Sequence, residues 1–245
     1  MKKIALMIPL LALAACEGSI ASAVGDTVSS KGGMTDGTPI STSAIDPGEF
    51  DGLTLAGPDN IVFTKGDDYS IRAEGDEDAI EHLRYKISNG QIKIGREGSS
   101  WSYNDKATIF VSAPTIASAK LAGSGDMTVD TIDGDDTKLS IAGSGDIKVA
   151  NVDAKSLTSK IAGSGDMALS GQSESIDISI AGSGKISAKD LTVEKAEISI
   201  AGSGDVELSS DGEVEAKVMG SGDVRVHGDA ECKSKAMGSG NITCG

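Results

Sequence analysis

A short phrase, Gly-Ser-Gly, recurs seven times in the second half of the chain at almost constant intervals. Each copy follows Ala or Met, and five of the seven are followed by Asp. The first glycines, with steps of 20, 20, 19, 20, 18 and 18 residues between them, are Gly123, Gly143, Gly163, Gly182, Gly202, Gly220 and Gly238. Such a repeat indicates a solenoid, in which a coil buries its apolar face only when its neighbours stack on it.

Apolar and polar residues alternate on both sides of each Gly-Ser-Gly. Ile176, Ile178 and Ile180 precede one copy, and Val206 and Leu208 follow another. A period of two is typical of strands with one inward face, whereas a helix needs a period near 3.6. We therefore expect an all-β fold, a parallel β-helix-like solenoid with two or three short strands in each coil of about 20 residues. Gly-Ser-Gly is expected at a tight bend that favours positive φ.

Stacking predicts files of equivalent side chains about 4.8 Å apart along the solenoid. One file contains the serines, whose hydroxyls could hydrogen-bond along it. The next file is acidic except near its middle and its end, and its members are Asp126, Asp146, Asp166, Lys185, Asp205, Asp223 and Asn241. We expect Lys185 to relieve part of the repulsion between these carboxylates, which can also accept backbone N–H groups of the turn.

A small β-rich module is predicted ahead of the repeats, over residues 47–120. Its expected strands are 50–55 and 61–63 as a first pair, then 69–73 and 107–113, and a hairpin spans 85–94 around Asn89-Gly90. A short helix is expected over 76–83, with Asp76 as its cap. The predicted organisation of the whole chain is residues 1–15, 16–46, 47–120 and 121–245, namely a signal peptide, a flexible tether, the module and the solenoid.

The first residues have the layout of a secretory signal, with Lys2-Lys3, an apolar run and a small-residue ending. Leu13-Ala14-Ala15-Cys16 resembles the lipobox of bacterial lipoproteins, which implies cleavage before Cys16 and acylation, including palmitate, at that residue. The alternative is an ordinary signal with an incidental cysteine. On the lipoprotein interpretation the membrane is a partner through the lipid anchor, and we expect a cell-envelope location, at the outer membrane if the cell has one.

Two cysteines remain once Cys16 is assigned. Cys232 and Cys244 align with Val214 and Val226 of the preceding repeat, so both should point inward in the last coil. A disulfide between them would fasten a terminal coil that has only one neighbour. That coil would have to taper, because bridged Cα atoms lie within about 7 Å whereas opposed sheets lie about 10 Å apart. Two buried free thiols are the alternative.

Composition and motifs argue against several function classes. The chain has 22 Lys+Arg against 37 Asp+Glu and a formal charge of -15, which argues against a nucleic acid partner. A hydrolase elbow needs Gly-x-Ser-x-Gly and a histidine base, whereas only His82 and His227 are present and the serine recurs seven times. No phosphate-binding or dinucleotide-binding loop is found, so we expect neither a cofactor nor an enzyme.

Two alternatives stay open beside a non-enzymatic role. Repeated Gly and Asp favour a calcium site at Asp126, Asp146 and Asp166, although the spacing is about twice that of calcium-binding nonapeptides. A polysaccharide-active enzyme would use paired carboxylates in a concave groove that bears aromatic residues. Trp101 and Tyr103 are the candidate residues for stacking on a sugar.

The chain resembles the head GIN domain family of auto-transporter adhesins. The resemblance covers residues 47–245 and rests on the order of 50–63, 85–94 and Val111-Ser112-Ala113-Pro114, followed by the repeated Ala-Gly-Ser-Gly-Asp. It implies a β-rich, solenoid-like envelope protein and supplies no catalytic residues. We therefore expect an adhesin-like or structural protein that contacts a glycan or protein surface through many weak interactions.

Overall fold

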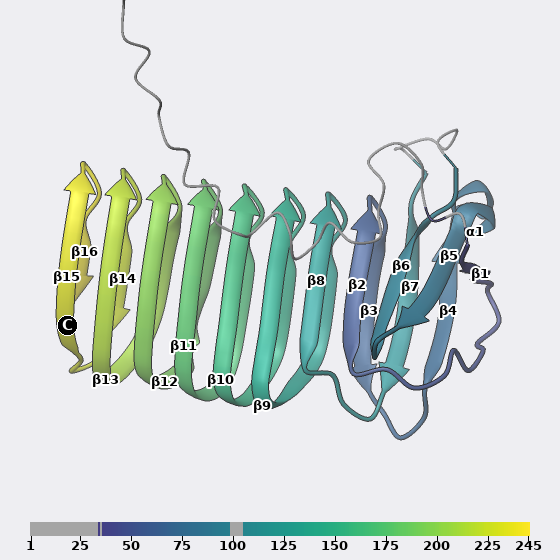
Figure 1. The fold of residues 1–245 in the computed structure, drawn as a ribbon, viewed down its shortest axis with the longest axis horizontal. Coiled ribbons are helices and arrows are strands. Elements are labelled where there is room, and N and C mark those ends of the chain that lie inside the picture. The colour runs from purple at the N-terminus through teal and green to yellow at the C-terminus, as the bar shows by residue number, and fades with distance from the viewer. Residues whose placement is uncertain (1–33, 35, 99–104) are drawn as a thin grey trace, which may run out of the picture.

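The computed structural model describes residues 34, 36–98 and 105–245, which form a flattened solenoid of stacked coils (Figure 1). Eight strands precede the long repeats: β1 (Thr38–Pro39), β2 (Gly52–Gly57), β3 (Asn60–Lys65), β4 (Ser70–Gly75), β5 (Leu83–Ser88), β6 (Gln91–Arg96), β7 (Ala107–Ala113) and β8 (Ser118–Gly123). The others are β9 (Met127–Gly143), β10 (Ile147–Gly163), β11 (Met167–Gly182), β12 (Lys185–Gly202), β13 (Asp205–Gly220), β14 (Val224–His227), β15 (Glu231–Gly238) and β16 (Ile242–Cys244). The helix is α1 (Glu77–His82).

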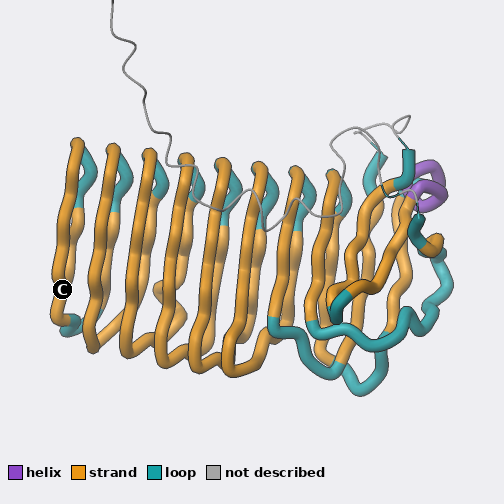
Figure 2. The backbone as a smooth tube through the Cα atoms, in the orientation of Figure 1, coloured by secondary structure: helices purple, strands orange, loops and turns teal. Residues whose placement is uncertain are grey.

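Each of β9 to β13 makes almost one full coil. The strand leaves one Gly-Ser-Gly corner, passes round a bend at the far side of the coil and returns to the next corner (Figure 2). Neighbouring coils are parallel and in register, so that Ile141 pairs with Ile161 and Ile147 pairs with Met167. The expected stack is confirmed, but the two or three short strands of a coil are one continuous strand, because the hydrogen-bonded ladder continues through the far bend.

The core lies between the two walls of the flattened coil and is mostly aliphatic in the repeats, with a few buried hydroxyl side chains such as Thr137 and Ser159. Leu139, Ile141, Ile147 and Val149 of adjoining coils are at most 1% exposed. Polar residues alternate with them on the outer faces. This arrangement follows from the period of two in the sequence, since successive side chains of a strand point to opposite faces.

The stack begins ahead of residue 121, within the module predicted over residues 47–120. β2 pairs with β6 and β8, while β3 pairs with β7 and β9. The expectation that β2 and β3 pair with each other is therefore wrong. They are opposite walls of one coil, and Gly57-Pro58-Asp59 occupies the place of a Gly-Ser-Gly corner between them. The predicted boundaries at residues 15, 46 and 120 stay predictions, although one sheet continues through the last of them.

Antiparallel strands cover the N-terminal end of the stack. β5 pairs with β6, β4 pairs with β7, and β1 adds to β5. The β5–β6 hairpin turns at Asn89 and Gly90, as predicted, with φ of 52° and 73°. Asp76 precedes α1, but its carboxylate accepts the N–H of Lys106 at 2.9 Å and does not cap the helix.

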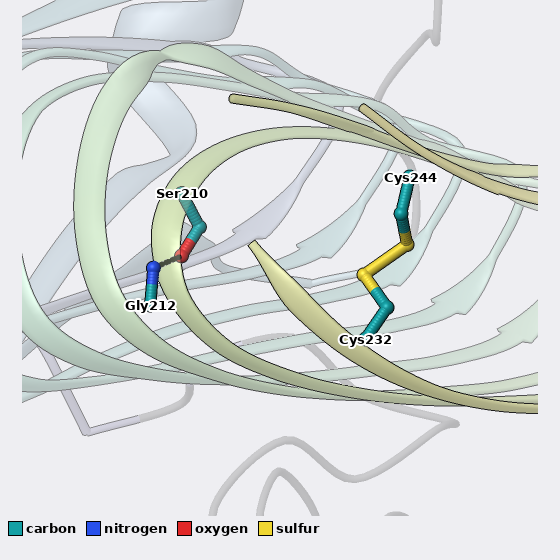
Figure 3. Close-up of a disulfide and its surroundings, with 4 residues drawn as sticks. All are labelled: Ser210, Gly212, Cys232 and Cys244. Carbon is teal, nitrogen blue, oxygen red and sulfur yellow. Dashed lines mark hydrogen bonds between the residues drawn. A yellow bond between two sulfur atoms is a disulfide. The ribbon is translucent and has the colours of Figure 1, made fainter. Parts of the chain in front are cut away.

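The C-terminal end is fastened by a disulfide between Cys232 and Cys244 (Figure 3). These residues register with Val214 and Val226 of the preceding coil, as expected. Their Cα atoms are 6.6 Å apart, well below the usual separation of about 10 Å between packed sheets. The last coil therefore tapers. Within the described residues, no helix has the length and apolar character needed to cross a membrane.

Candidate binding surface

The acidic file at the corners acts as a continuation of the backbone ladder. The carboxylate of Asp126 accepts the N–H of Asp146 at 3.2 Å, and Asp146 accepts the N–H of Asp166 at 2.8 Å. The same bond joins Asp205 to the N–H of Asp223 at 2.9 Å. Each carboxylate thus bonds to the next coil, as the sequence suggested for turn N–H groups.

Lys185 breaks this pattern, because an ammonium group cannot accept a hydrogen bond. Its own N–H still donates to Asp166 at 2.8 Å. The N–H of Asp205 in the following coil bonds instead to the carbonyl of Gly184 at 3.2 Å. The role of the file is therefore structural, and it depends on an oxygen acceptor at each step.

The corner serines do not form the expected file of bonded hydroxyls within the described part of the chain. Their backbone N–H groups bond to the coil before, as in Ser164 to Gly143 at 2.9 Å and Ser144 to Gly123 at 3.0 Å. The hydroxyls are exposed to solvent. No geometry typical of a nucleophile is therefore present at these corners.

The remaining predictions from the sequence concern a calcium site, a lipidated cysteine and a sugar-stacking pair. Across residues 34, 36–98 and 105–245, no group of three or more His, Cys, Asp or Glu side chains is placed to hold a metal ion. The calcium alternative at Asp126, Asp146 and Asp166 therefore gains no set of donors here. Cys16, Trp101 and Tyr103 lie outside the described residues, so lipidation and sugar stacking stay predictions.

A groove of about 710 Å³ crosses the far bends of β9 to β12, on the side of the coils opposite the corners. We call it the acidic groove. Its lining residues are Asp133, Gly134, Asp135, Asp153, Ala154, Lys155, Gly171, Gln172, Ser173, Glu174, Thr192, Val193 and Glu194. It runs across four successive coils, which corresponds to about 14 Å along the stack.

The groove has a floor formed by one residue of each coil, between two polar rims. Gly134, Ala154, Ser173 and Val193 are in register with one another from coil to coil, and the last three are at most 9% exposed. The residues on either side of them in the sequence point outward as the rims. One rim is Asp133, Asp153, Gln172 and Thr192, and the other is Asp135, Lys155, Glu174 and Glu194.

The groove lies where neighbouring coils are unequal in length. The repeat that contains β11 is one residue shorter than the repeats on either side, and the register shifts between β10 and β11 and again between β11 and β12. Gly171 permits the close approach, since a Cβ at that position would lie 2.3 Å from the carbonyl oxygen of Val152. Its φ of 119° also favours glycine.

The charges on the rims are only partly paired. Lys155 binds Asp135 at 2.8 Å and Lys65 binds Asp133 at 3.0 Å. The hydrogen bond that Lys155 donates to Asp135, followed by the charge of Asp135 and the charges of Glu174 and Asp136, raises the pKa of Lys155 above its usual value. Five acids and one lysine line the groove, which leaves a clear excess of negative charge.

Two glutamates of the groove are available to a ligand. Glu174 and Glu194 occupy successive positions on one rim and are exposed. Within the described residues, neither carboxylate makes a hydrogen bond or an ion pair. They are the groups in the groove most open to a charged partner.

Sequence reasoning missed this groove. The 19-residue step between Gly163 and Gly182 and the lone Gly171 in the middle of a coil were the available signals. The repeated Gly-Ser-Gly is a much stronger sequence signal, and it marks the corners on the opposite side of the coils. The unequal coils become informative only when the register between neighbours is known.

A buried ion pair near the N-terminal end was also missed. Arg96 donates to both carboxylate oxygens of Asp59, at 2.7 and 2.6 Å, and the two side chains are at most 1% exposed. The N–H of Ala107 bonds to the same carboxylate at 2.9 Å. The pair joins the end of β6 to the β2–β3 corner, so it supports the fold and lies away from the acidic groove.

An in-register β-solenoid with one covered end and an open groove across its bends defines the class of β-solenoid repeat proteins. The sequence family described as "Putative auto-transporter adhesin, head GIN domain" matches residues 49–230. The chain belongs to this family, as its resemblance suggested. A comparison with curated proteins gave no significant match.

Solved structures support the same fold. A protein of Bacteroides fragilis described as an adhesin has a TM-score of 0.74 at 20% identity, covering 85% of this chain and 100% of its own. A protein of Parabacteroides merdae, also described as an adhesin, has a TM-score of 0.66 at 19% identity, covering 84% of this chain and 96% of its own. A protein of Parabacteroides distasonis described as lipid binding has a TM-score of 0.63 at 22% identity, covering 85% and 98%.

Proposed function

We propose that this chain is a non-enzymatic protein of the cell envelope that binds a surface ligand through its solenoid. The observation that carries the proposal is the groove, which is open along four coils and suits an extended ligand. Membership of an adhesin family and the likeness to solved adhesins support it. Neighbouring coils supply equivalent positions at regular intervals, so many weak contacts can add up along one ligand.

The proposed membrane anchor is a lipid on Cys16. The signal-like start and Leu13-Ala14-Ala15-Cys16 support cleavage and acylation, and two or more acyl chains hold a protein stably on a membrane. Palmitate labelling of cells that express the chain should mark the wild type and not the Cys16→Ser variant. Equal labelling of both would refute the anchor.

Two other roles find less support in the groove, namely a polysaccharide-active enzyme and lipid binding, the latter taken from the description of the Parabacteroides distasonis protein. Glycosidases place two carboxylates around the bond to be cut and hold sugars on aromatic platforms, whereas no lining residue of the groove is aromatic. A lipid tail would meet carboxylates on both rims, which is unfavourable for an apolar ligand. Binding of a polar ligand without turnover is the role that fits these residues.

The binding role is tested with the full chain carrying Cys16→Ser, which removes the acylation site. Glycan arrays and pull-downs from envelope fractions should reveal retained partners, and mixtures with polysaccharides should release no new reducing ends. Failure to retain any surface component would refute the proposed function. Release of reducing ends would favour the enzyme alternative.

A further inference from the structure

The charge of the acidic groove restricts the chemistry of its ligand. Its rims contain the carboxylates of Asp133, Asp135, Asp153, Glu174 and Glu194, against the ammonium groups of Lys155, which lines the groove, and Lys65, which binds Asp133 at 3.0 Å. Lys155 is already held by Asp135 at 2.8 Å. The whole chain also has a formal charge of -15, so an anionic ligand would be repelled both by the groove and at long range.

The shape of the groove restricts the ligand further. The floor residues Ala154, Ser173 and Val193 are buried, and the rims continue for about 14 Å along the stack. An extended peptide rises about 3.3 Å per residue, so four or five residues would fill this length. Its side chains would reach the rims from a backbone lying over the residues of the floor.

Lysine and arginine side chains fit both requirements. Their cationic ends sit on flexible stems that can reach either rim, where Glu174 and Glu194 are exposed. Sugars are usually held by stacking on aromatic rings, and the lining residues include none. The groove thus favours a basic peptide over a glycan.

We propose that the acidic groove binds an extended, lysine- or arginine-rich segment of a partner protein. This inference rests on the proposed function and names the chemistry of its ligand. Glu174 and Glu194 make the principal contacts with the cationic side chains, while Asp153 and Gln172 of the opposite rim border the peptide. Binding weakens as salt rises, because exposed charge pairs are screened.

The test uses fluorescently labelled hexalysine and the full chain carrying Cys16→Ser, with fluorescence anisotropy as the readout. Replacing Glu174→Gln and Glu194→Gln together should weaken binding about tenfold at low salt, or about threefold for each exposed charge contact. The matched control is Glu77→Gln with Glu81→Gln on α1, which changes the net charge equally at the far end of the stack. The control should change the affinity less than twofold, and circular dichroism should show the same fold for all variants.

Three results would overturn the inference. The first is no binding of hexalysine at low salt. The second is an equal loss in the groove and control variants, which would mean that only the net charge acts. The third is tighter, groove-dependent binding of a chitosan hexamer, which would assign the groove to an amine-bearing glycan. In that last case the proposed surface-binding function would still stand.

Discussion

At each corner, the backbone of the preceding coil leaves room only for glycine. Gly163 has a φ of 139°, and a Cβ there would lie 2.1 Å from the carbonyl oxygen of Gly143. Gly165 would meet the carbonyl of Gly145 at the same distance. A carbonyl inside a ladder cannot move aside as a side chain could. Both glycines of each Gly-Ser-Gly therefore avoid a clash with a carbonyl oxygen of the preceding coil, whereas the serine between them is exposed.

Replacing Gly163→Ala should lower the free energy of unfolding by about 2–4 kcal/mol, since it adds both backbone strain and a clash. The matched control, Ser164→Ala, should stay within about 0.5 kcal/mol of the wild type. Urea unfolding followed by circular dichroism measures both variants. Equal stability of the two would show that the corner glycines are not under this constraint.

The corner aspartates should be replaceable by another acceptor. Asn60 occupies the equivalent place at the start of the file and accepts the N–H of Asp126 at 3.0 Å. Asp146→Asn should therefore preserve stability, while Asp146→Ala should cost about 1 kcal/mol through the lost bond to Asp166. Thermal unfolding of the two variants separates these outcomes. A loss as large for Asn as for Ala would contradict an acceptor role.

At the scale of elements, the sequence predicted those parts that depend on neighbouring residues. The β5–β6 hairpin lies where Asn89-Gly90 indicated, and the inward positions of the repeats follow the alternation of Ile and Val. The pairing of β2 with β6 and β8 was missed, because nothing in the residues of Gly52–Gly57 indicates partners 39 and 66 residues further along the chain. The groove was missed for the same reason, since its lining residues come together only through the register between β10, β11 and β12.

The pair of Arg96 and Asp59 should be a strong link between β6 and the β2–β3 corner. Asp59→Ala leaves a buried guanidinium without its carboxylate, and it should lower the free energy of unfolding by about 3–5 kcal/mol. The double variant Asp59→Asn with Arg96→Met should recover part of that loss, because it removes the uncompensated charge. Chemical denaturation of both proteins gives the comparison. A double variant less stable than Asp59→Ala alone would disagree with this explanation.

On the scale of the whole molecule, the two ends of the stack differ. β4, β5 and α1 cover the N-terminal end, whereas β15 and β16 pair with earlier strands on one side only. Ile242 and Cys244 are partly exposed, although their partners in the coil before, Val224 and Val226, are at most 1% exposed. The disulfide holds together a coil that has less packing than the others.

Removing the disulfide with Cys232→Ser and Cys244→Ser should loosen the last coil and spare the rest. Amide hydrogen exchange should become faster in β15 and β16, while protection in β9 to β12 stays as in the wild type. The reason is that stability in a solenoid comes from contacts between nearest neighbours. Faster exchange throughout the stack would mean that the disulfide supports the whole fold.

The fold and the binding surface both depend on consecutive coils meeting in register at the far bends. Asp153 and Gln172 are paired in β10 and β11, and the side chain of Gln172 donates to Asp153 at 3.1 Å. Thr192 lies one coil further on, opposite Gln172. Residues in adjacent coils lie about 5 Å apart and those two coils apart about 10 Å, against a disulfide limit of about 7 Å.

Cysteine pairs introduced into the full chain carrying Cys16→Ser measure this register directly. Under mild oxidation, Asp153→Cys with Gln172→Cys should form a disulfide, detected by mass spectrometry, while Asp153→Cys with Thr192→Cys should stay reduced. Formation of the second bond as readily as the first, or failure of the first to form in a folded protein, would contradict the in-register stack and the groove built on it.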